Sequence, residues 1–195
     1  YYGGLLFLEE GASVNCSGMV GEDNFAGDQG GGLYARDSTL ILWSCDLHRN
    51  VSPQGAAMYL THVGEVNLTG ASMQDNYALG RSSVVFSVAS KVWAEEVIFS
   101  ASKEEQARGR VVQVDPSSTF TAHRCNFSGW TGEDMIASIG GALTLDSCDF
   151  RKSSSLMPVT ANPMYPAVIR NAITGDLTYA GAMNPLRLVD NALGC

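Results

Sequence analysis

Three residues of the kinds used in acid–base catalysis and metal binding recur along the chain at similar intervals: Glu95, His123 and Asp146. If a repeating fold brings them into one row, a carboxylate–imidazole–carboxylate set could bind a metal ion or transfer protons. Ion pairs between exposed residues of neighbouring strands explain the same row more simply. We therefore expect neither a cofactor nor catalysis from it, and retain it only as a weak candidate for a metal site.

The five cysteines show no Cys-x-x-Cys spacing, which argues against a zinc site. Four of them fall at positions expected to face inward, where small buried thiols pack well: Cys16, Cys45, Cys125 and Cys148. Cys125 and Cys148 would stack one repeat apart, within reach of a disulfide bond. Cys195 has no partner in the sequence and could bond beyond it.

Asn-x-Ser/Thr sequons, the acceptor sites of N-linked glycans in eukaryotic secretory proteins, occur four times, at Asn15, Asn50, Asn67 and Asn126. Three of these asparagines lie between residues expected to point inward, so they should point outward and are the glycosylation candidates: Asn67 first, then Asn15 and Asn126. Asn50 instead recurs at intervals of 26 residues with Asn24 and Asn76. Such asparagines can stack as a ladder at a turn, so we expect Asn50 to be unmodified.

A repeat of about 26 residues would position all these side chains. Shifting residues 38–50 along the chain in steps of 26, 28 and 23 residues aligns six units with one pattern, apolar-x-apolar-x-x-small-x-apolar-x-x-polar. One inward column reads Val14, Leu40, Val66, Val92, Phe120 and Leu143. A second block alternates with the first, most clearly as Gly30-Gly31-Gly32-Leu33-Tyr34 and Gly55-Ala56-Ala57-Met58-Tyr59.

Both blocks are short and alternating, and no part of the repeat shows ten residues of helical periodicity. Each unit therefore predicts two or three short strands that pair with their copies one coil away. The expected fold is all-β: a right-handed parallel β-helix solenoid of six to seven coils, with the repeats over residues 1–155. Residues 156–195 contain four prolines and are expected to form a final irregular coil, a cap or a link to a following module.

A leucine-rich repeat is the competing solenoid, because Leu40-x-Leu42-x-x-Cys45-x-Leu47 fits its core pattern. That fold needs a second half-repeat that is rich in leucine and packs as a helix or an extended turn. Here the second half is Gly-Gly-Leu-Tyr or Ala-Ala-Met-Tyr, flanked by Asp, Ser and Gly, which favours the β-helix.

The two blocks resemble the paired motifs of the polymorphic membrane protein repeat family, whose fold is a right-handed parallel β-helix of the pectin-lyase-like type. The family's Gly-Gly-Ala-Ile motif resembles Gly31-Gly32-Leu33-Tyr34 and Ala56-Ala57-Met58-Tyr59, and its Phe-x-x-Asn motif resembles Leu47-x-x-Asn50 and Met73-x-x-Asn76. The resemblance covers about residues 3–155. It implies a cell-surface or secreted β-helix used for adhesion or as a structural shaft, and it implies no catalytic residues.

The composition narrows the class of function. Twelve basic and twenty acidic residues give a net charge of −8, which argues against nucleic acid as a partner. No run of 18 apolar residues is present, so we expect no membrane insertion. The chain starts at Tyr1 without Met and ends at Cys195, and we expect it to be a piece of a longer or processed protein.

The favoured function is a non-catalytic structural or adhesive module outside the cell or at its surface. Its expected partners are other protein subunits or modules of the same protein, with glycans as a further class. The alternative is a β-helix enzyme acting on polysaccharides, or a carbohydrate-binding module without catalysis. Such hydrolases need clustered carboxylates on one face, whereas here no Asp-Asp pair occurs and the aspartates considered are scattered: Asp46, Asp146 and Asp149.

One apolar strip is expected on the outer surface. Ile41 and Trp93 fall in the same outward row as Asn15 and Asn67, and Trp43 lies at the adjacent corner. Exposed apolar residues that gather in this way mark partner sites. Either a neighbouring subunit or module docks on this strip, or the turn at residues 101–109 folds over it.

Overall fold

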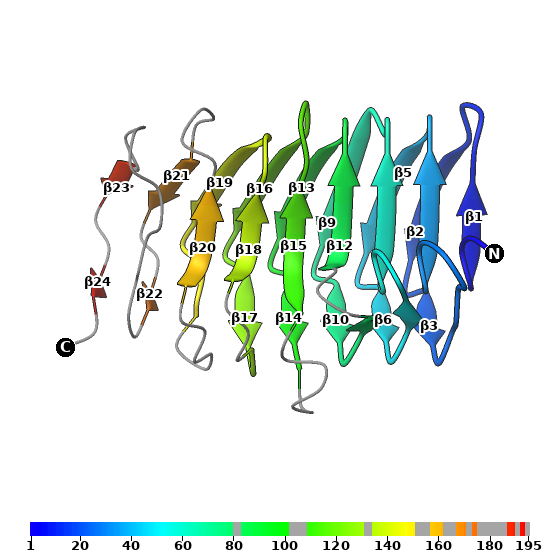
Figure 1. The fold of residues 1–195 in the computed structure, drawn as a ribbon, viewed down its shortest axis with the longest axis horizontal. Coiled ribbons are helices and arrows are strands. Elements are labelled where there is room, and N and C mark those ends of the chain that lie inside the picture. The colour runs from blue at the N-terminus through cyan, green and yellow to red at the C-terminus, as the bar shows by residue number, and fades with distance from the viewer. Residues whose placement is uncertain are drawn as a thin grey trace.

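The computed structural model shows a solenoid of parallel β-strands whose coils follow one another along a single axis (Figure 1). It describes residues 1–79, 83–101, 109–130, 134–150, 157–161, 167–170, 173–174, 187–189 and 192–193. None of these residues is helical, and no helix that could span a membrane is found among them. The predicted all-β parallel β-helix is confirmed, and the leucine-rich repeat is ruled out because three parallel sheets replace its single strand and helix per unit.

Three sheets run along the stack, and each coil contributes one strand to a sheet. The first sheet contains β1 (Leu6–Leu8), β4 (Leu33–Arg36), β8 (Met58–Thr61), β12 (Ser83–Val88), β15 (Arg110–Val114), β18 (Asp134–Ser138) and β20 (Met157–Ala161). The second contains β2 (Ser13–Ser17), β5 (Thr39–Trp43), β9 (Glu65–Thr69), β13 (Lys91–Glu95), β16 (Thr119–His123), β19 (Ala142–Asp146), β21 (Ala167–Arg170) and β23 (Arg187–Val189). The third contains β3 (Val20–Glu22), β6 (Asp46–His48), β10 (Ser72–Gln74), β14 (Ile98–Ser100) and β17 (Asn126–Ser128). Two short ladders join β7 (Val51–Ser52) to β11 (Tyr77–Ala78) and β22 (Ile173–Thr174) to β24 (Ala192–Leu193).

Each strand pairs with its copy in the register that the 26-residue repeat predicts. In the second sheet, Leu40 lies opposite Val14 on one side and Val66 on the other. The same column continues through Val92, Phe120 and Leu143. Side chains alternate between the two faces of a strand, so this register turns the apolar set inward as a whole.

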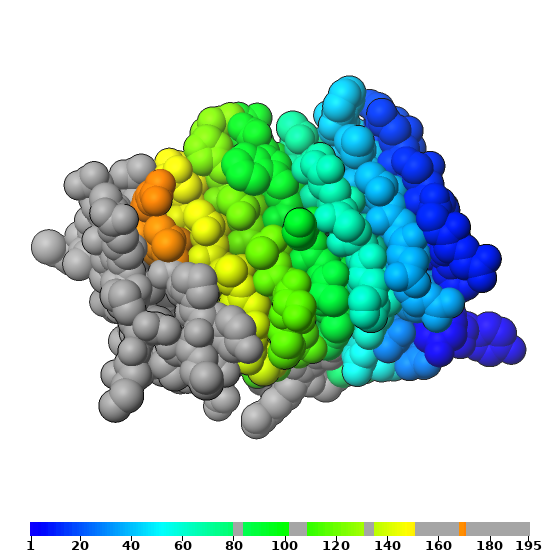
Figure 2. Space-filling model, turned by 90° about the horizontal axis from the view of Figure 1, so that it is seen from above, coloured from blue at the N-terminus to red at the C-terminus, as the bar shows by residue number. Residues whose placement is uncertain are grey.

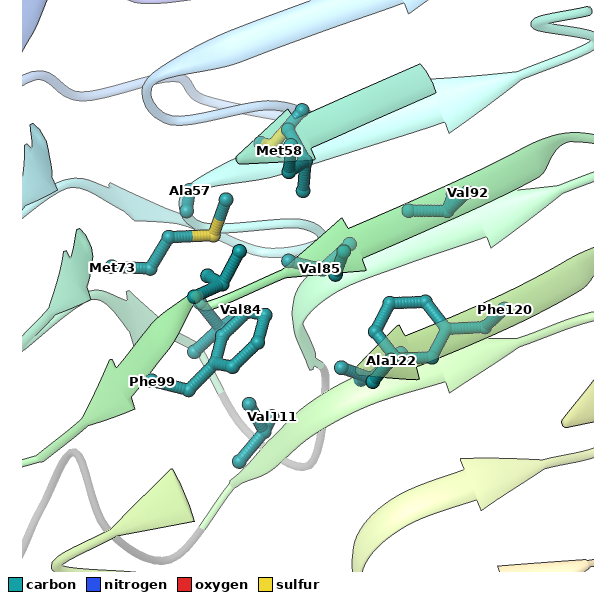
Figure 3. Close-up of a cluster of buried hydrophobic side chains, with 14 of the residues drawn as sticks. Ala57, Met58, Met73, Val84, Val85, Val92, Phe99, Val111, Phe120 and Ala122 are labelled. Carbon is teal, nitrogen blue, oxygen red and sulfur yellow. The ribbon is translucent and has the colours of Figure 1, made fainter. Parts of the chain in front are cut away.

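Ladders of like residues fill the interior, where the side chains from the three sheets meet (Figure 3). The rings of Phe99, Phe127 and Phe150 stack with centroids 4.9 and 4.8 Å apart and planes tilted by 9° and 5°. Met73 and Leu47 precede them in the same column. A fully buried side chain of this size contributes roughly 1.5–3 kcal/mol, so these ladders stabilise the packing of each coil on the next.

A left-handed backbone corner joins the second sheet to the third in successive coils. Glycine occupies it twice, at Gly18 (φ 66°) and Gly70 (φ 60°), but Ser44, Glu96 and Arg124 adopt the same conformation, with φ of 48°, 55° and 51°. Residues other than glycine rarely hold a positive φ, so its recurrence at one position shows that the coil imposes the corner. The corner turns the next strand so that its middle residue faces inward.

Five coils carry a strand in all three sheets, close to the expected six to seven. β18 and β19 belong to a sixth coil, in which Asp149 bridges to Asn126 at the place of the third sheet. Beyond residue 155, β20 and β21 pair in parallel with β18 and β19, so the stack continues into the segment expected to be irregular. Pro158 lies in β20, the last strand of the first sheet, where an edge tolerates proline.

Candidate functional site

The second sheet brings the carboxylate–imidazole–carboxylate row together on its outer face. Glu95, His123 and Asp146 lie directly opposite one another on β13, β16 and β19. His123 Nδ1 is 3.5 Å from Glu95 Oε1, and its Nε2 is 3.9 Å from Asp146 Oδ2. The imidazole therefore lies between the two carboxylates as a link between three coils.

Arg124 forms ion pairs with Glu95 of this row and with the adjacent Glu96. Its guanidinium donates to Glu95 Oε1 at 2.6 Å and to Glu96 Oε1 at 2.9–3.0 Å. A hydrogen bond from Trp93 Nε1 and the charge of Arg124 lower the pKa of Glu95 below its ordinary value of 4.5. Among the residues that the structure describes, no group of His, Cys, Asp and Glu side chains meets the geometry of a metal site. The row thus forms a charged ladder across the coils.

A second charged ladder lies on the third sheet, and the sequence analysis missed it. His48 Nε2 lies 2.9 Å from Glu22 Oε2, and Arg49 donates at 2.7 Å to both carboxylate oxygens of Asp23. Hydrogen bonds from His48 and, second in size, from Arg49 lower the pKa of Glu22. Hydrogen bonds to the carboxylates of Asp23 and Glu22 raise the pKa of Arg49. Glu22 and His48 are 26 residues apart, as are Asp23 and Arg49, and this spacing could have predicted the ladder.

The three asparagines form a hydrogen-bond ladder, in which Asn50 and Asn76 are buried and Asn24 is half-buried. The backbone N and side-chain Nδ2 of Asn24 both donate to Asn50 Oδ1, at 3.1 and 2.8 Å. Asn50 donates in the same way to Asn76 Oδ1, at 3.1 and 2.9 Å, and its Nδ2 also reaches Gly21 O at 3.0 Å. Each Oδ1 thus accepts from the coil before it, and the ladder has a direction.

Cys125 and Cys148 stack one coil apart in the core, but both are free thiols, so the disulfide suggested by their spacing is not formed. Their Sγ atoms instead approach backbone carbonyl oxygens, those of Ala94 and Ala122, at 3.5 and 3.6 Å. The hydrogen bond to Cys125 and burial both raise the pKa of Cys148, which keeps it protonated. Cys195 lies outside the described residues.

The predicted apolar strip lies on the outer face of the second sheet. Asn15, Ile41, Asn67 and Trp93 follow one another on four neighbouring strands, and Trp43 belongs to the next row of β5. Trp43 and Trp93 remain 51% and 44% exposed. A shallow depression of about 450 Å³ lies between them, lined by Ile41, Trp43, Glu65, Asn67, Thr69 and Trp93. The alternative was that the turn at residues 101–109 covers this strip. Residues 102–108 of that turn lie outside the described residues.

The other outward sequon asparagines also lie on strands. Asn15 is exposed on β2, and Asn126 is half-buried on β17. Asn50, by contrast, is fully buried in the asparagine ladder. The geometry therefore separates three accessible acceptor positions from one that a glycan could not occupy in the folded protein.

The first coil lies at one end of the stack (Figure 2). Its inward layer is only partly buried. Val14, Cys16 and Met19 are only half-buried, whereas their counterparts one coil on, Leu40, Leu42 and Cys45, are fully buried. The same coil carries six exposed large apolar side chains: Tyr1, Tyr2, Leu5, Phe7, Val20 and Phe25. Its strands β1, β2 and β3 are each the end strand of their sheet. The sequence analysis did not predict this exposed apolar surface on the first coil.

Comparisons with models of known protein families, with curated protein sequences and with solved structures found no match to this chain. The class of protein that the structure defines is therefore the parallel β-helix, and function must be argued from its surfaces.

Proposed function

We propose that the chain is a non-catalytic structural module of an extracellular or cell-surface protein, and that a coil of another subunit, or of another part of the same protein, packs on the first coil of its stack. The partly open inward layer of the first coil carries the proposal. Val14, Cys16 and Met19 continue columns that are fully buried one coil further along. Apolar surface left this way is stabilised when another surface covers it.

The surface that fits this end is another β-helix coil. The edges of β1, β2 and β3 present backbone groups in the pattern that a parallel strand pairs with. The asparagine ladder supports the same surface. The Oδ1 of Asn50 and that of Asn76 each accept hydrogen bonds from the preceding coil, so Asn24 Oδ1 is the acceptor for a coil that packs on the first one. A coil from a neighbouring subunit, or from another module of the same protein, satisfies all three features together.

The charged ladders support a structural role rather than a catalytic one. Glu95, His123 and Arg124 are engaged with one another across coils, as are Glu22, His48 and Arg49. A general acid and base must instead face a substrate. The resemblance to polymorphic membrane protein repeats, and through it to the pectin-lyase-like superfold, supports placing the module at the cell surface or in the secreted fraction.

Replacing an apolar residue of the first coil tests the proposal. Phe25 is 65% exposed, so Phe25→Ser should leave the melting temperature of the isolated chain unchanged and prevent the full protein from joining its native assembly. Leu79→Ser, a change of an exposed residue outside the first coil, is the matched control and should assemble normally. Normal assembly of Phe25→Ser, or release of sugars from a panel of polysaccharides by the wild-type protein, would overturn the proposal.

A further inference from the structure

The three outward sequon asparagines have neighbours of the same kind. Each lies directly opposite a large apolar side chain on the adjacent strand: Asn67 opposite Ile41 and Trp93, Asn15 opposite Ile41, and Asn126 opposite Ile98. Trp93 and Ile98 are both 44% exposed. The inward sequon asparagine, Asn50, has only asparagines as its ladder neighbours. Acceptor positions and uncovered apolar side chains therefore occur together on the outer faces of the second and third sheets.

Asn67 lies at the centre of this arrangement. It lines the depression of about 450 Å³ between Trp43 and Trp93. It also lines a second depression of about 350 Å³ on the side of Trp93 that includes Lys91 and Thr119. A group attached to the Asn67 side chain thus begins between the two tryptophans, with space on either side.

Three polar side chains, Glu65, Asn67 and Thr69, line the depression together with Ile41 and the two tryptophans. The Glu65 carboxylate accepts a hydrogen bond from Asn67 Nδ2 at 2.9 Å, and the Thr69 side chain completes the wall. A protein partner that covered this depression would have to remove the Glu65 carboxylate from water and supply donors for it, which is costly unless the pairing is complete. A sugar ring fits better, because its C–H face packs on an indole while its hydroxyls donate to the carboxylate.

We propose that Asn67 carries an N-linked glycan whose first sugar lies in the depression between Trp43 and Trp93 and covers the apolar strip. The inference rests on the proposed extracellular placement, since the modification belongs to the secretory pathway. It assigns the cover of the strip to the protein's own glycan and leaves the first coil of the stack as the surface for assembly.

The modification is a glycosyl transfer from a lipid-pyrophosphate-linked oligosaccharide. Asn67 Nδ2 forms a bond to the anomeric carbon of the sugar, the bond from that carbon to the pyrophosphate oxygen breaks, and Nδ2 loses one proton. The lipid pyrophosphate leaves with the bonding electrons. The linked nitrogen keeps one N–H, which can still donate to Glu65 Oε1.

Site mapping is the first part of the test. The full protein, isolated from its native source, should carry a glycan at Asn67 and none at Asn50. In a eukaryotic secretory host, Thr69→Ala should abolish the modification at Asn67, and Thr69→Ser, which preserves the sequon, should retain it. A bare Asn67 with glycans at Asn15 or Asn126 overturns the inference while the proposed extracellular role stands. Absence of glycan from every sequon overturns the inference too.

Fluorescence quenching then tests where the first sugar lies. In a Trp43→Phe background, acrylamide quenching reports on Trp93, because Trp130 is fully buried. Protein trimmed by an endoglycosidase to one sugar at Asn67 should keep Trp93 protected. Removal of the whole glycan from untrimmed protein by an amidase, which leaves aspartate, should abolish the protection, and Asn67→Asp should match the amidase-treated protein.

Equal quenching of the trimmed and the bare protein would overturn the inference, since the sugar would then point away from the indole. That result would leave the proposed assembly through the first coil untouched, because Phe25 and the open layer belong to another surface. Association of the bare protein with a protein partner through Trp93 would assign the strip to that partner instead and would likewise contradict the inference.

Discussion

Phe127 lies directly on Phe99, with ring centroids 4.9 Å apart and planes tilted by 9°, and both side chains are fully buried. The contact joins the third-sheet strands of two coils, β14 and β17. It is a direct measure of the coil register, because any shift by one residue would turn both rings to solvent.

Truncating either ring tests this register. Phe99→Ala and Phe127→Ala should each lower the free energy of unfolding by roughly 3–5 kcal/mol, because each leaves a cavity in a packed ladder. Ile98→Ala is the matched control, since Ile98 is the neighbour of Phe99 that faces outward. Chemical denaturation with circular dichroism gives the comparison. A loss below about 1 kcal/mol at both phenylalanines would show that the rings are not core residues.

The asparagine ladder predicts a strong dependence on one amide. Asn50→Ala would remove the side-chain partner of Gly21 O and of the backbone N and Nδ2 of Asn24, and would leave Asn76 Oδ1 only the backbone N of residue 50. Each unsatisfied buried group costs about 1–3 kcal/mol, so the expected destabilisation is at least about 2 kcal/mol. Thermal unfolding of Asn50→Ala and of Asn15→Ala, whose side chain is exposed, measures the difference. Equal melting temperatures for the two variants would mean that the ladder contributes nothing.

The Glu95 row predicts a dependence on acid. The folded-state pKa of Glu95 is below its ordinary value of 4.5, so its ionised form stabilises the fold above that pH. This stabilisation should disappear as the pH falls below about 4.5 and through the lowered pKa. The difference in melting temperature between wild type and Glu95→Gln should therefore shrink on acidification. A difference that stays constant from neutral pH to about pH 3 would show that the hydrogen bond from Trp93 and the ion pair with Arg124 do not stabilise the protein.

Trp93 and Trp130 test which rows of side chains face the core and which face solvent. In unglycosylated protein, Trp93→Ser should change the free energy of unfolding by about 1 kcal/mol or less, because the ring is 44% exposed. Trp130→Ser should cost roughly 3–5 kcal/mol, since that ring is fully buried and its Nε1 donates to Phe99 O at 3.4 Å. Denaturant titrations of both variants decide the point. A larger loss for Trp93→Ser would reverse the assignment of inward and outward rows.

Most of the fold could be predicted from the sequence because its repeat is short and regular. Columns such as Val14, Leu40 and Val66 follow from alternation and a 26-residue shift alone. The asparagine ladder follows from the same shift, and the structure places Asn24, Asn50 and Asn76 one above another. In a solenoid, sequence period and spatial neighbourhood coincide, which is rare in folds with long-range contacts.

The features that could not be predicted depend on three-dimensional detail. Ser44 and Glu96 do not reveal a left-handed corner, because the coil imposes it against their preference. The spacing of Cys125 and Cys148 suggested a disulfide, but both thiols are free and each lies near a backbone carbonyl oxygen. The open layer at Val14 and Met19 is invisible in the repeat, because these residues match their buried copies in type and differ only in being at the end of the stack.

The most direct test of the central claim is hydroxyl-radical footprinting of Phe7 and Phe25 in the native assembly and in the isolated chain. Both side chains are exposed in the isolated chain and should be oxidised readily. If the first coil is the assembly surface, their oxidation should fall strongly in the native assembly, whereas that of Leu79, an exposed residue away from this end, should not change. Oxidation of Phe7 and Phe25 at the same rate in both samples would contradict the claim that this module assembles through the first coil of its stack.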